Sequence, residues 1–153
     1  MANPKSEPVP KERHLVDHVG EDLWRAFRAY EKAMFARVNA SGFDDISLAD
    51  SDILVLLEPE GIRLTELARR RQVTKQAAHE QVHSLVKRGY LALETDPEDR
   101  RARIVCYTRK GLNLTRALAD IKRQLNRKVT DAIGADRLRV LRETLAVVEE
   151  KLG

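Results

Sequence analysis

The sequence has few of the residues that stabilise secreted or membrane proteins. It holds a single cysteine, Cys106, among 153 residues, which excludes an intrachain disulfide framework and a zinc knuckle. No run of 18 apolar residues is present, and the N-terminal stretch MANPKSEPVPKE lacks the apolar segment of a signal peptide. We therefore expect a soluble, cytoplasmic protein without membrane contact, in which any metal would be bound by histidine and carboxylate.

Prolines are few and are concentrated at the start of the chain. Three of the five, Pro4, Pro8 and Pro10, fall within the first dozen residues, where they disfavour a helix. A chain of this length with 42% hydrophobic residues can bury one core but not two comfortable ones. We expect residues 1–12 to form a mobile tail and residues 13–153 to form a single domain.

Acidic residues become scarce after the first third of the chain. Residues 1–61 carry 7 basic and 12 acidic residues, whereas residues 62–110 carry 12 basic and 6 acidic residues. The remainder, 111–153, carries 9 basic and 6 acidic residues. A basic block in mid-chain favours a polyanion partner, most simply nucleic acid, and a solvated charged surface accounts for it equally well.

Hydrophobic periodicity predicts a mainly helical chain with one small β-hairpin. Apolar residues recur at three- and four-residue steps through most of the sequence, and the leucines of the last segment follow heptad spacing. Ser47 and Asp50 form a near-capping box at the start of the second helix. The predicted elements are helices over 14–39, 48–58, 64–72 and 75–88, a hairpin over 90–108, and helices over 112–133 and 137–152.

The stretch HEQVH resembles an enzyme active site. His79, Glu80 and His83 fit the H-E-x-x-H pattern of zinc peptidases, in which two histidines one helical turn apart bind zinc and the glutamate is the general base. The extended form of the pattern needs a glycine and a third histidine where this chain has Val86 and Gly89. A zinc-dependent hydrolase therefore remains an alternative with an incomplete ligand set, and we expect no metal.

A helical wheel divides the segment around HEQVH into two faces. At 100° per residue, Ala78, Val82 and Leu85 lie close to one line with Val86 beside them, and this stripe is predicted to pack inward. The opposite face gathers polar residues with His79 at its edge. These are Gln76, Glu80, His83 and Lys87.

Three segments together resemble the MarR family of winged helix-turn-helix transcriptional regulators. They are LTELA at 64–68, VTKQAAHEQVHSLVKRGYL at 73–91 and DPEDRRARIVCYTRKG at 96–111. The last matches the wing pattern of the family except for Tyr107 in a leucine position. The resemblance implies a mainly α fold with a small β-hairpin wing, in which a winged helix-turn-helix over about 47–110 is flanked by dimerisation helices over about 13–40 and 111–153.

The chain departs from the family pattern at two other places. Arg71 and Gln72 stand where the family has an apolar residue and a glycine, in the turn between the two helices of the motif. Arg63 stands where the third helix usually has a serine or threonine cap, so the first turn of that helix is predicted to fray.

The resemblance and the polar face of the fourth helix predict the residues that contact DNA. Base readout in the major groove is assigned to Gln76, His79, Glu80 and His83, with Glu80 paired to Lys87 or an arginine or accepting from cytosine. Arg101 is expected to enter the minor groove, with Asp99 holding its guanidinium. Contacts to the phosphate backbone are assigned to Arg69, Arg70, Arg71, Lys75, Lys87, Arg88 and Arg100.

The resemblance further implies a homodimer on a pseudo-palindromic operator, acting as a repressor that a small aromatic effector releases. Trp24, Phe27 and Tyr30 are the candidate effector pocket, although aromatic residues at helical spacing more often belong to a core. No cofactor is expected. An architectural DNA binder with little sequence preference is a further alternative. Sensing by the lone Cys106 thiol, or by a metal at His14 and His18, is less favoured.

Overall fold

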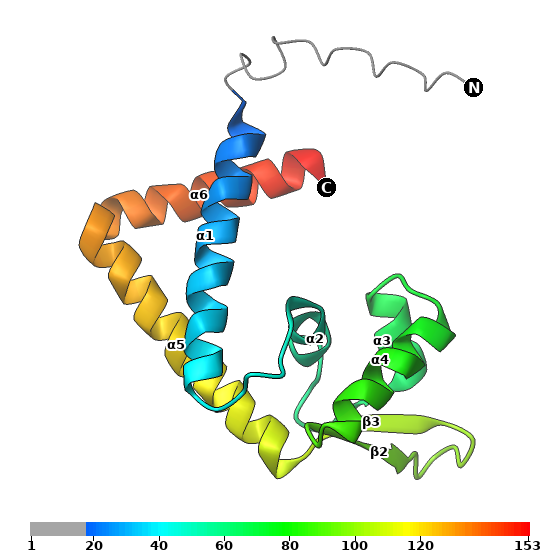
Figure 1. Cartoon of the computed structure of the whole chain (residues 1–153). Helices are drawn as coiled ribbons and strands as arrows, with labels where there is room; N and C mark the ends of the chain where they lie inside the picture. Colours follow the sequence, from blue (N-terminus) through cyan, green and yellow to red (C-terminus); the bar gives the residue numbers. More distant parts are fainter. Residues whose placement is uncertain (1–17) are drawn as a thin grey trace, which may run out of the picture.

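The computed structural model describes residues 18–153, and within them the chain is mainly helical with one small sheet (Figure 1). The predictions for residues 1–12 and for His14 lie outside the described residues. None of the helices between residues 18 and 153 has the length and apolar content needed to cross a membrane. The helices are α1 (Val19–Ala40), α2 (Leu48–Leu54), α3 (Leu64–Arg70), α4 (Lys75–Lys87), α5 (Arg109–Ile133) and α6 (Ala135–Leu152), and the strands are β1 (Ile62–Arg63), β2 (Leu91–Thr95) and β3 (Arg103–Tyr107).

The sheet has one strand more than the predicted hairpin. β2 and β3 pair antiparallel with Leu91 opposite Tyr107, as a hairpin requires. β1 pairs antiparallel with the other edge of β3, so the order is β1-β3-β2. A strand of two residues, Ile62 and Arg63, is too short to leave an alternating pattern in the sequence, and for this reason it was not predicted.

Helix α2 begins as predicted and ends earlier. The Ser47–Asp50 capping box is present in full, but the helix stops at Leu54 instead of continuing to Pro59. The residues that follow must bring the chain to β1, where Gly61 has a φ of +87° and a Cβ would lie 2.8 Å from the carbonyl oxygen of Val105. The positive φ and the close approach of β1 to β3 therefore require a glycine at position 61.

The inner face of α4 is the centre of the winged helix-turn-helix core. Ala78, Val82 and Leu85 are fully buried, which confirms the predicted inward stripe. They belong to a core that includes Leu67 of α3 and Tyr90 after α4. Burial of a valine or leucine side chain such as Val82 or Leu85 contributes about 1.5–3 kcal/mol, so this stripe holds α4 firmly against the rest of the motif.

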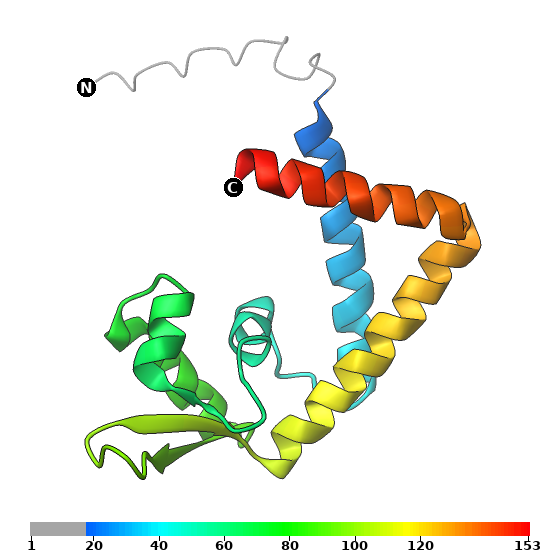
Figure 2. The same ribbon diagram turned by 180° about the vertical axis from the view of Figure 1, so that it is seen from behind.

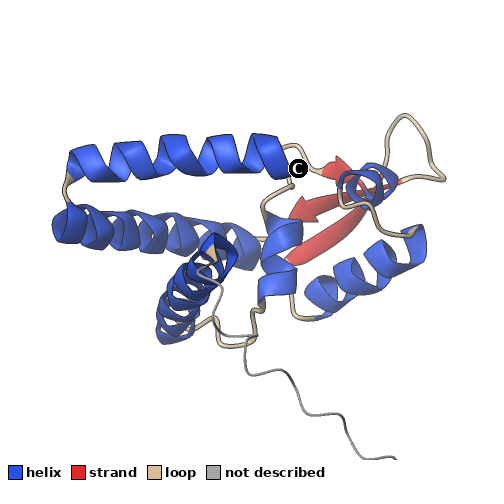
Figure 3. Cartoon of the chain, turned by 90° about the horizontal axis from the view of Figure 1, so that it is seen from above, coloured by secondary structure: helices blue, strands red, loops and turns tan. Residues whose placement is uncertain are grey.

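The remaining helices extend away from the winged helix-turn-helix. α5 and α6 form the two arms of a V that meet at Gly134 (Figures 1 and 2). Seen from above, α1 lies on one side of α5 and α6 on the other (Figure 3). No residue of α6 is buried, although the helix carries Leu141, Leu145 and other apolar side chains.

A partly buried ion pair joins α2 to the end of α4. Arg88 donates through Nη2 to Oδ1 of Asp50 at 2.6 Å and through Nη1 to Oδ2 at 3.1 Å. Burial alone would raise the pKa of Asp50, but hydrogen bonds from Arg88 and Ser47 together lower that pKa below its ordinary value. Arg88 also donates to the main-chain carbonyl of Asp45. Arg88, which was predicted to contact phosphate, is thus engaged in hydrogen bonds within the fold, and its phosphate contact stays a prediction.

We expect Asp50→Asn to lower the free energy of unfolding by about 2 kcal/mol, because the Arg88 guanidinium would lose its charged partner while it stays half-buried. The folded-state pKa of Asp50 lies below its ordinary value of 3.8, so the pair stabilises the wild type above that pH and is lost as the pH falls through the folded-state pKa. Urea unfolding at pH 7 and at pH 3 measures both effects.

Asp52→Asn is the matched control, because Asp52 lies on the same helix with an exposed side chain. Equal stability losses in the two variants at pH 7 would show that the ion pair contributes nothing beyond a general effect of charge.

Candidate nucleic-acid interface

The outer face of α4 presents the polar side chains that were predicted to lie there. Gln76, His79, Glu80 and His83 are all exposed, on the side of the helix opposite the buried stripe. Gln76 donates through Nε2 to Oε1 of Glu80 at 3.2 Å, so Glu80 has a neutral amide partner, and its predicted pairing with a cation or with cytosine stays a prediction. The rings of His79 and His83 stand 4.4 Å apart between centroids. Hydrogen-bond donors and acceptors therefore lie together on one solvent-facing surface of α4.

The zinc-peptidase pattern HEQVH lies on this exposed face of α4. Among residues 18–153, no three side chains of the histidine, cysteine, aspartate and glutamate types come together as a metal site. His79 and His83 supply two imidazoles on an exposed helix face, and a catalytic zinc site requires three protein ligands. The residues that the structure describes thus do not assemble the ligand set of a zinc peptidase around HEQVH.

The turn between α3 and α4 has a left-handed backbone at Gln72, where the family pattern has a glycine. Gln72 has a φ of +53°, which is a left-handed conformation that costs a residue with a side chain roughly 1 kcal/mol. The amide N–H of Val73 donates to the carbonyl oxygen of Ala68 at 3.1 Å and closes the turn. Arg71, the other departure, donates to the side chain of Gln81 on α4. The departure at Gln72 therefore introduces local backbone strain in the turn.

Two of the arginines predicted to contact phosphate already have acidic partners. Glu66 accepts from Arg69 at 2.7 Å and from Arg70 at 2.8 Å, and these hydrogen bonds lower the pKa of Glu66 to about 2. Arg70 donates also to Glu58 at 2.8 Å. All of these pairs lie at the surface, where water and salt weaken them, so a phosphate can compete for either guanidinium at modest cost.

The first turn of α4 is free to approach an anion. The side chain of Thr74 accepts from the amide N–H of Ala77 at 3.1 Å and caps the helix as predicted. Lys75 follows it with an exposed side chain, and Lys87 lies exposed in the last turn. Unpaired backbone N–H groups at a helix N-terminus favour a phosphate, and Lys75 adds a full positive charge beside them.

The loop between β2 and β3 carries the wing arginines. Arg100 and Arg101 are both exposed there. Asp99 was expected to hold the Arg101 guanidinium, but its Oδ1 instead accepts from the main-chain N–H of Arg101 at 3.0 Å. The carboxylate therefore shapes the loop backbone and leaves the guanidinium exposed at the tip.

The root of the wing contains a residue that the sequence interpretation did not connect to it. Arg63, predicted only as a poor cap for α3, makes no cap hydrogen bond. Its guanidinium donates to Asp96 at 2.5 Å and to Glu98 at 3.1 Å. Both acceptors follow β2, the strand at the opposite edge of the sheet from β1. A sequence separation of 33 residues and more leaves no local pattern, and an arginine in a cap position was the one available signal.

The three predicted effector residues do not enclose a pocket together. Trp24, Phe27 and Tyr30 lie along α1 and are 64%, 51% and 39% exposed. Tyr30 lines an open hollow of about 780 Å³ between α5 and α6, which the other two do not line. A second hollow, of about 430 Å³, lies where α1, α2, α5 and β3 meet, and the sequence interpretation missed it. Its walls include Met34, Leu54, Val55, Tyr107 and Leu118, with Asp52 and Lys122 as charged members.

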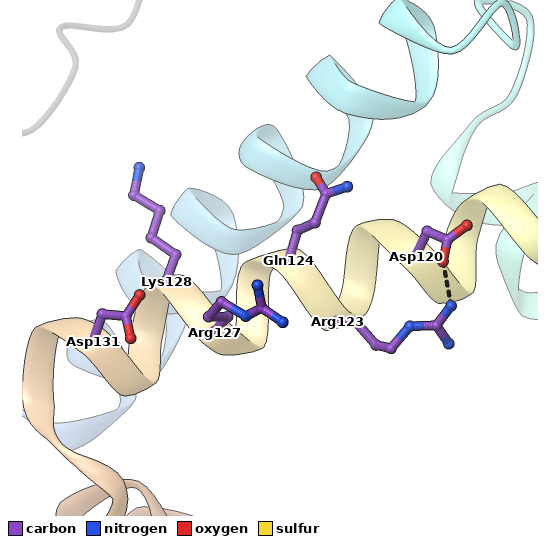
Figure 4. A pocket seen from close by; sticks show the side chains of 6 residues that line it. All are labelled: Asp120, Arg123, Gln124, Arg127, Lys128 and Asp131. Carbon is purple, nitrogen blue, oxygen red and sulfur yellow. Dashed lines mark hydrogen bonds and ion pairs between the residues drawn. The ribbon is translucent and has the colours of Figure 1, made fainter.

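A third hollow is formed by α5 alone. Figure 4 shows its charged lining, with Asp120 paired to Arg123. It is a shallow surface of about 490 Å³ between side chains of one helix and offers no enclosed site. The other lining residues are Gln124, Arg127, Lys128 and Asp131.

The two other sensing predictions find no support in the geometry. Burial, with a smaller contribution from Glu94, raises the pKa of the Cys106 thiol, which disfavours the reactive thiolate. His18 accepts the N–H of Gly20 through Nδ1 at 3.0 Å and so caps α1.

Comparisons with known proteins agree with this architecture. Residues 44–102 match the sequence profile of the MarR family. No curated protein sequence matches the chain. Three solved structures share its fold at low sequence identity. They are FabT from Streptococcus pneumoniae in complex with DNA (TM-score 0.77, 20% identity, 88% of this chain and 94% of that chain), the PcaV transcriptional regulator from Streptomyces coelicolor in complex with its natural ligand (0.67, 23%, 89% and 94%), and a MarR transcriptional regulator from Methanosarcina mazei Go1 (0.67, 21%, 87% and 94%).

These likenesses confirm the predicted fold class, a mainly helical chain with a small antiparallel sheet as its wing. Residues 44–102 thus resemble the MarR family in sequence, and the described part of the chain shares the winged helix-turn-helix fold of the solved regulators.

Proposed function

We propose that this protein is a sequence-specific DNA-binding regulator that binds a pseudo-palindromic operator as a homodimer. One observation carries the proposal: α4 is held by a fully buried apolar stripe and turns four polar side chains, Gln76, His79, Glu80 and His83, to solvent. A helix of this kind fits the major groove of B-DNA, where each base pair presents its own pattern of donors and acceptors.

Each side chain on the outer face has a chemical role open to it. The amide of Gln76 can bond the N6 and N7 edge of adenine in bidentate fashion, and either histidine can donate to guanine. Glu80 can accept from the amino group of cytosine, and its hydrogen bond with Gln76 holds both side chains in a common orientation. The lysines at the two ends of α4, with Arg69, Arg70 and Arg71, would contact phosphates and set the register.

The wing supplies a second contact in this proposal. Arg100 and Arg101 lie exposed in the loop beyond β2, on the part of the molecule that lies away from α5 and α6 (Figure 1). A guanidinium on a narrow loop can enter the minor groove, where A·T-rich stretches concentrate negative potential. We assign Arg101 to that groove and Arg100 to the adjacent backbone.

The solved relatives support a DNA partner and a ligand. FabT was solved in complex with DNA, and PcaV with its natural ligand. In this chain the hollow of about 430 Å³ between α1, α2, α5 and β3 combines apolar walls with the ammonium of Lys122 and the carboxylate of Asp52. A largely apolar pocket with few charged groups suits a small aromatic effector. Such a ligand would release DNA if it binds best to a dimer whose α4 helices are wrongly spaced.

The dimer is supported by apolar side chains without cover in one subunit. Trp24 and Phe27 of α1 are more than half exposed, and α6 buries no residue although it carries several aliphatic ones. Apolar surface of this extent is uncommon on a monomer and is typical of a subunit interface. A twofold pair would present two α4 helices to half-sites about one turn of DNA apart.

We expect Gln76→Ala to lower the preference for the operator over random DNA about tenfold, because the variant loses a bidentate base contact. Lys75→Ala is the matched comparison: it should weaken binding to both duplexes alike and reduce the salt dependence by about one charge. Fluorescence anisotropy on the two duplexes over a range of salt concentrations distinguishes them. If both variants behaved alike, α4 would not read bases and the protein would be an architectural DNA binder.

Arg101→Ala is expected to weaken operator binding more than about tenfold and to leave thermal unfolding unchanged, because its guanidinium leaves solvent only in the complex. Arg137→Ala removes the same charge from an exposed position on α6 and serves as the control. Unchanged affinity of the Arg101 variant in an anisotropy titration would refute the minor-groove role.

Leu145→Asp should convert the dimer into a monomer and weaken operator binding by about a hundredfold, since the two half-sites would then be bound independently. The subunit itself should stay folded, because Leu145 is 40% exposed within it. Ala146→Asp introduces the same single carboxylate at an exposed position outside the leucine stripe of α6 and serves as the control. Light scattering at micromolar concentration reports the mass, and a monomeric wild type would contradict the proposal.

A further inference from the structure

The side chain of Arg63 joins the two outer strands of the sheet. Arg63 lies on β1 opposite Ile104 of β3, and β3 separates β1 from β2. Its Nε donates to Oδ2 of Asp96, the residue after β2, at 2.5 Å. Its Nη2 donates to Oε2 of Glu98 at 3.1 Å. One guanidinium therefore fastens β1 to the point where the wing loop leaves β2.

Asp96 is the buried member of this bridge. It is only 2% exposed, whereas Arg63 and Glu98 reach solvent. Oδ1 of Asp96 accepts from the main-chain N–H of Glu98 at 2.8 Å, so both carboxylate oxygens are engaged. The hydrogen bond from Arg63, followed by that from Glu98, holds the pKa of Asp96 below its ordinary value. A buried carboxylate in this position needs its cationic partner.

Hydrogen bonds continue from Asp96 to the tip of the wing. The N–H of Asp96 donates to the carbonyl of Ala102 at 3.2 Å, and the N–H of Ala102 donates to the carbonyl of Asp99 at 2.8 Å. Oδ1 of Asp99 then accepts from the N–H of Arg101 at 3.0 Å. The backbone on both sides of Arg100 is thus tied through Asp96 to Arg63.

Arg63 also stands directly before α3. It occupies the N-cap position of that helix without forming a cap hydrogen bond, so its side chain is committed entirely to the wing. α3 in turn packs on α4 through the buried side chain of Leu67. The bridge therefore connects the helix-turn-helix with the loop that carries Arg101.

We propose that Arg63 is a positioning residue for DNA binding, which holds the wing tip at a fixed place relative to α4 so that both grooves are engaged at once. The inference rests on the proposed DNA-binding function. A loop ordered before binding loses less conformational freedom in the complex than a loop that must be ordered by DNA. Arg63 would then strengthen binding through Arg101 and without a DNA contact of its own.

The test is a double-mutant cycle between Arg63→Met and Arg101→Ala, with a duplex that the wild-type protein has selected from a random pool. Methionine keeps the apolar stem and removes the donors. We expect Arg63→Met to weaken binding about tenfold in the wild-type background and less than about twofold when Arg101 is already alanine. The position of the wing affects affinity through Arg101, so it no longer matters once that side chain is absent. Arg63→Lys, which restores a cation near Asp96, should recover part of the affinity.

A phosphate contact by Arg63 predicts different results. The two losses would then add, and the slope of log affinity against log salt would fall by about one charge for Arg63→Met. Additive losses with that change of slope would overturn the inference, and so would undiminished affinity of Arg63→Met. If Arg101→Ala alone had no effect, the wing contact of the proposed function would fail first and the inference with it.

A second variant separates wing position from loss of stability. Arg63→Met leaves the Asp96 carboxylate buried without a cation, whereas Arg63→Met with Asp96→Asn removes the buried charge as well. We expect the double variant to unfold at a temperature closer to that of the wild type and still to bind weakly. Hydrogen exchange should show faster exchange of the Arg101 and Ala102 amides in both variants. Slow exchange at these amides would mean that the wing keeps its position without the bridge.

Discussion

The structure depends on the burial of one face of α4. Ala78, Val82 and Leu85 are fully buried, and the periodicity of an α-helix then directs Gln76, Glu80 and His83 to solvent. The same packing gives HEQVH a structural origin that does not depend on zinc. Spacing of three and four residues is what a metal-binding helix needs, and it is also what any helix needs in order to present a coherent polar face. The pattern therefore marks an exposed polar surface, for which we propose hydrogen bonding to DNA as the function.

Most of the fold could be predicted because its signals are local. The α4 stripe, the Ser47–Asp50 capping box and the β2–β3 hairpin each follow from residues within a few positions of one another. Contacts between distant residues left no such signal. Arg88 was assigned to phosphate because an arginine at the end of an exposed helix has that role in general, and its partner Asp50 is 38 residues away. Arg63 was missed as a wing residue for the same reason.

The winged helix-turn-helix and the outer helices differ in how much apolar surface they bury. The winged helix-turn-helix shares one hydrophobic core with α1 and α5, and the Arg88–Asp50 and Arg63–Asp96 pairs tie it together at its edges. The outer helices leave more apolar surface exposed, since α6 buries none of its residues and the side chains of Trp24 and Phe27 on α1 are more than half exposed. The hollow where α1, α2, α5 and β3 meet lies between these parts, so a ligand there would contact both. In the proposed dimer, a ligand in this hollow would therefore couple to the spacing of the two α4 helices.

The central claim is that α4 and the wing read a DNA sequence, and selection of duplexes from a random pool tests it most directly. The purified full-length protein would be incubated with the pool at physiological salt, with a parallel sample that contains a metal chelator. The account predicts enrichment of one inverted repeat, with half-sites about one helical turn apart, in both samples. Salt-sensitive binding without an enriched motif, or enrichment that the chelator abolishes, would contradict it.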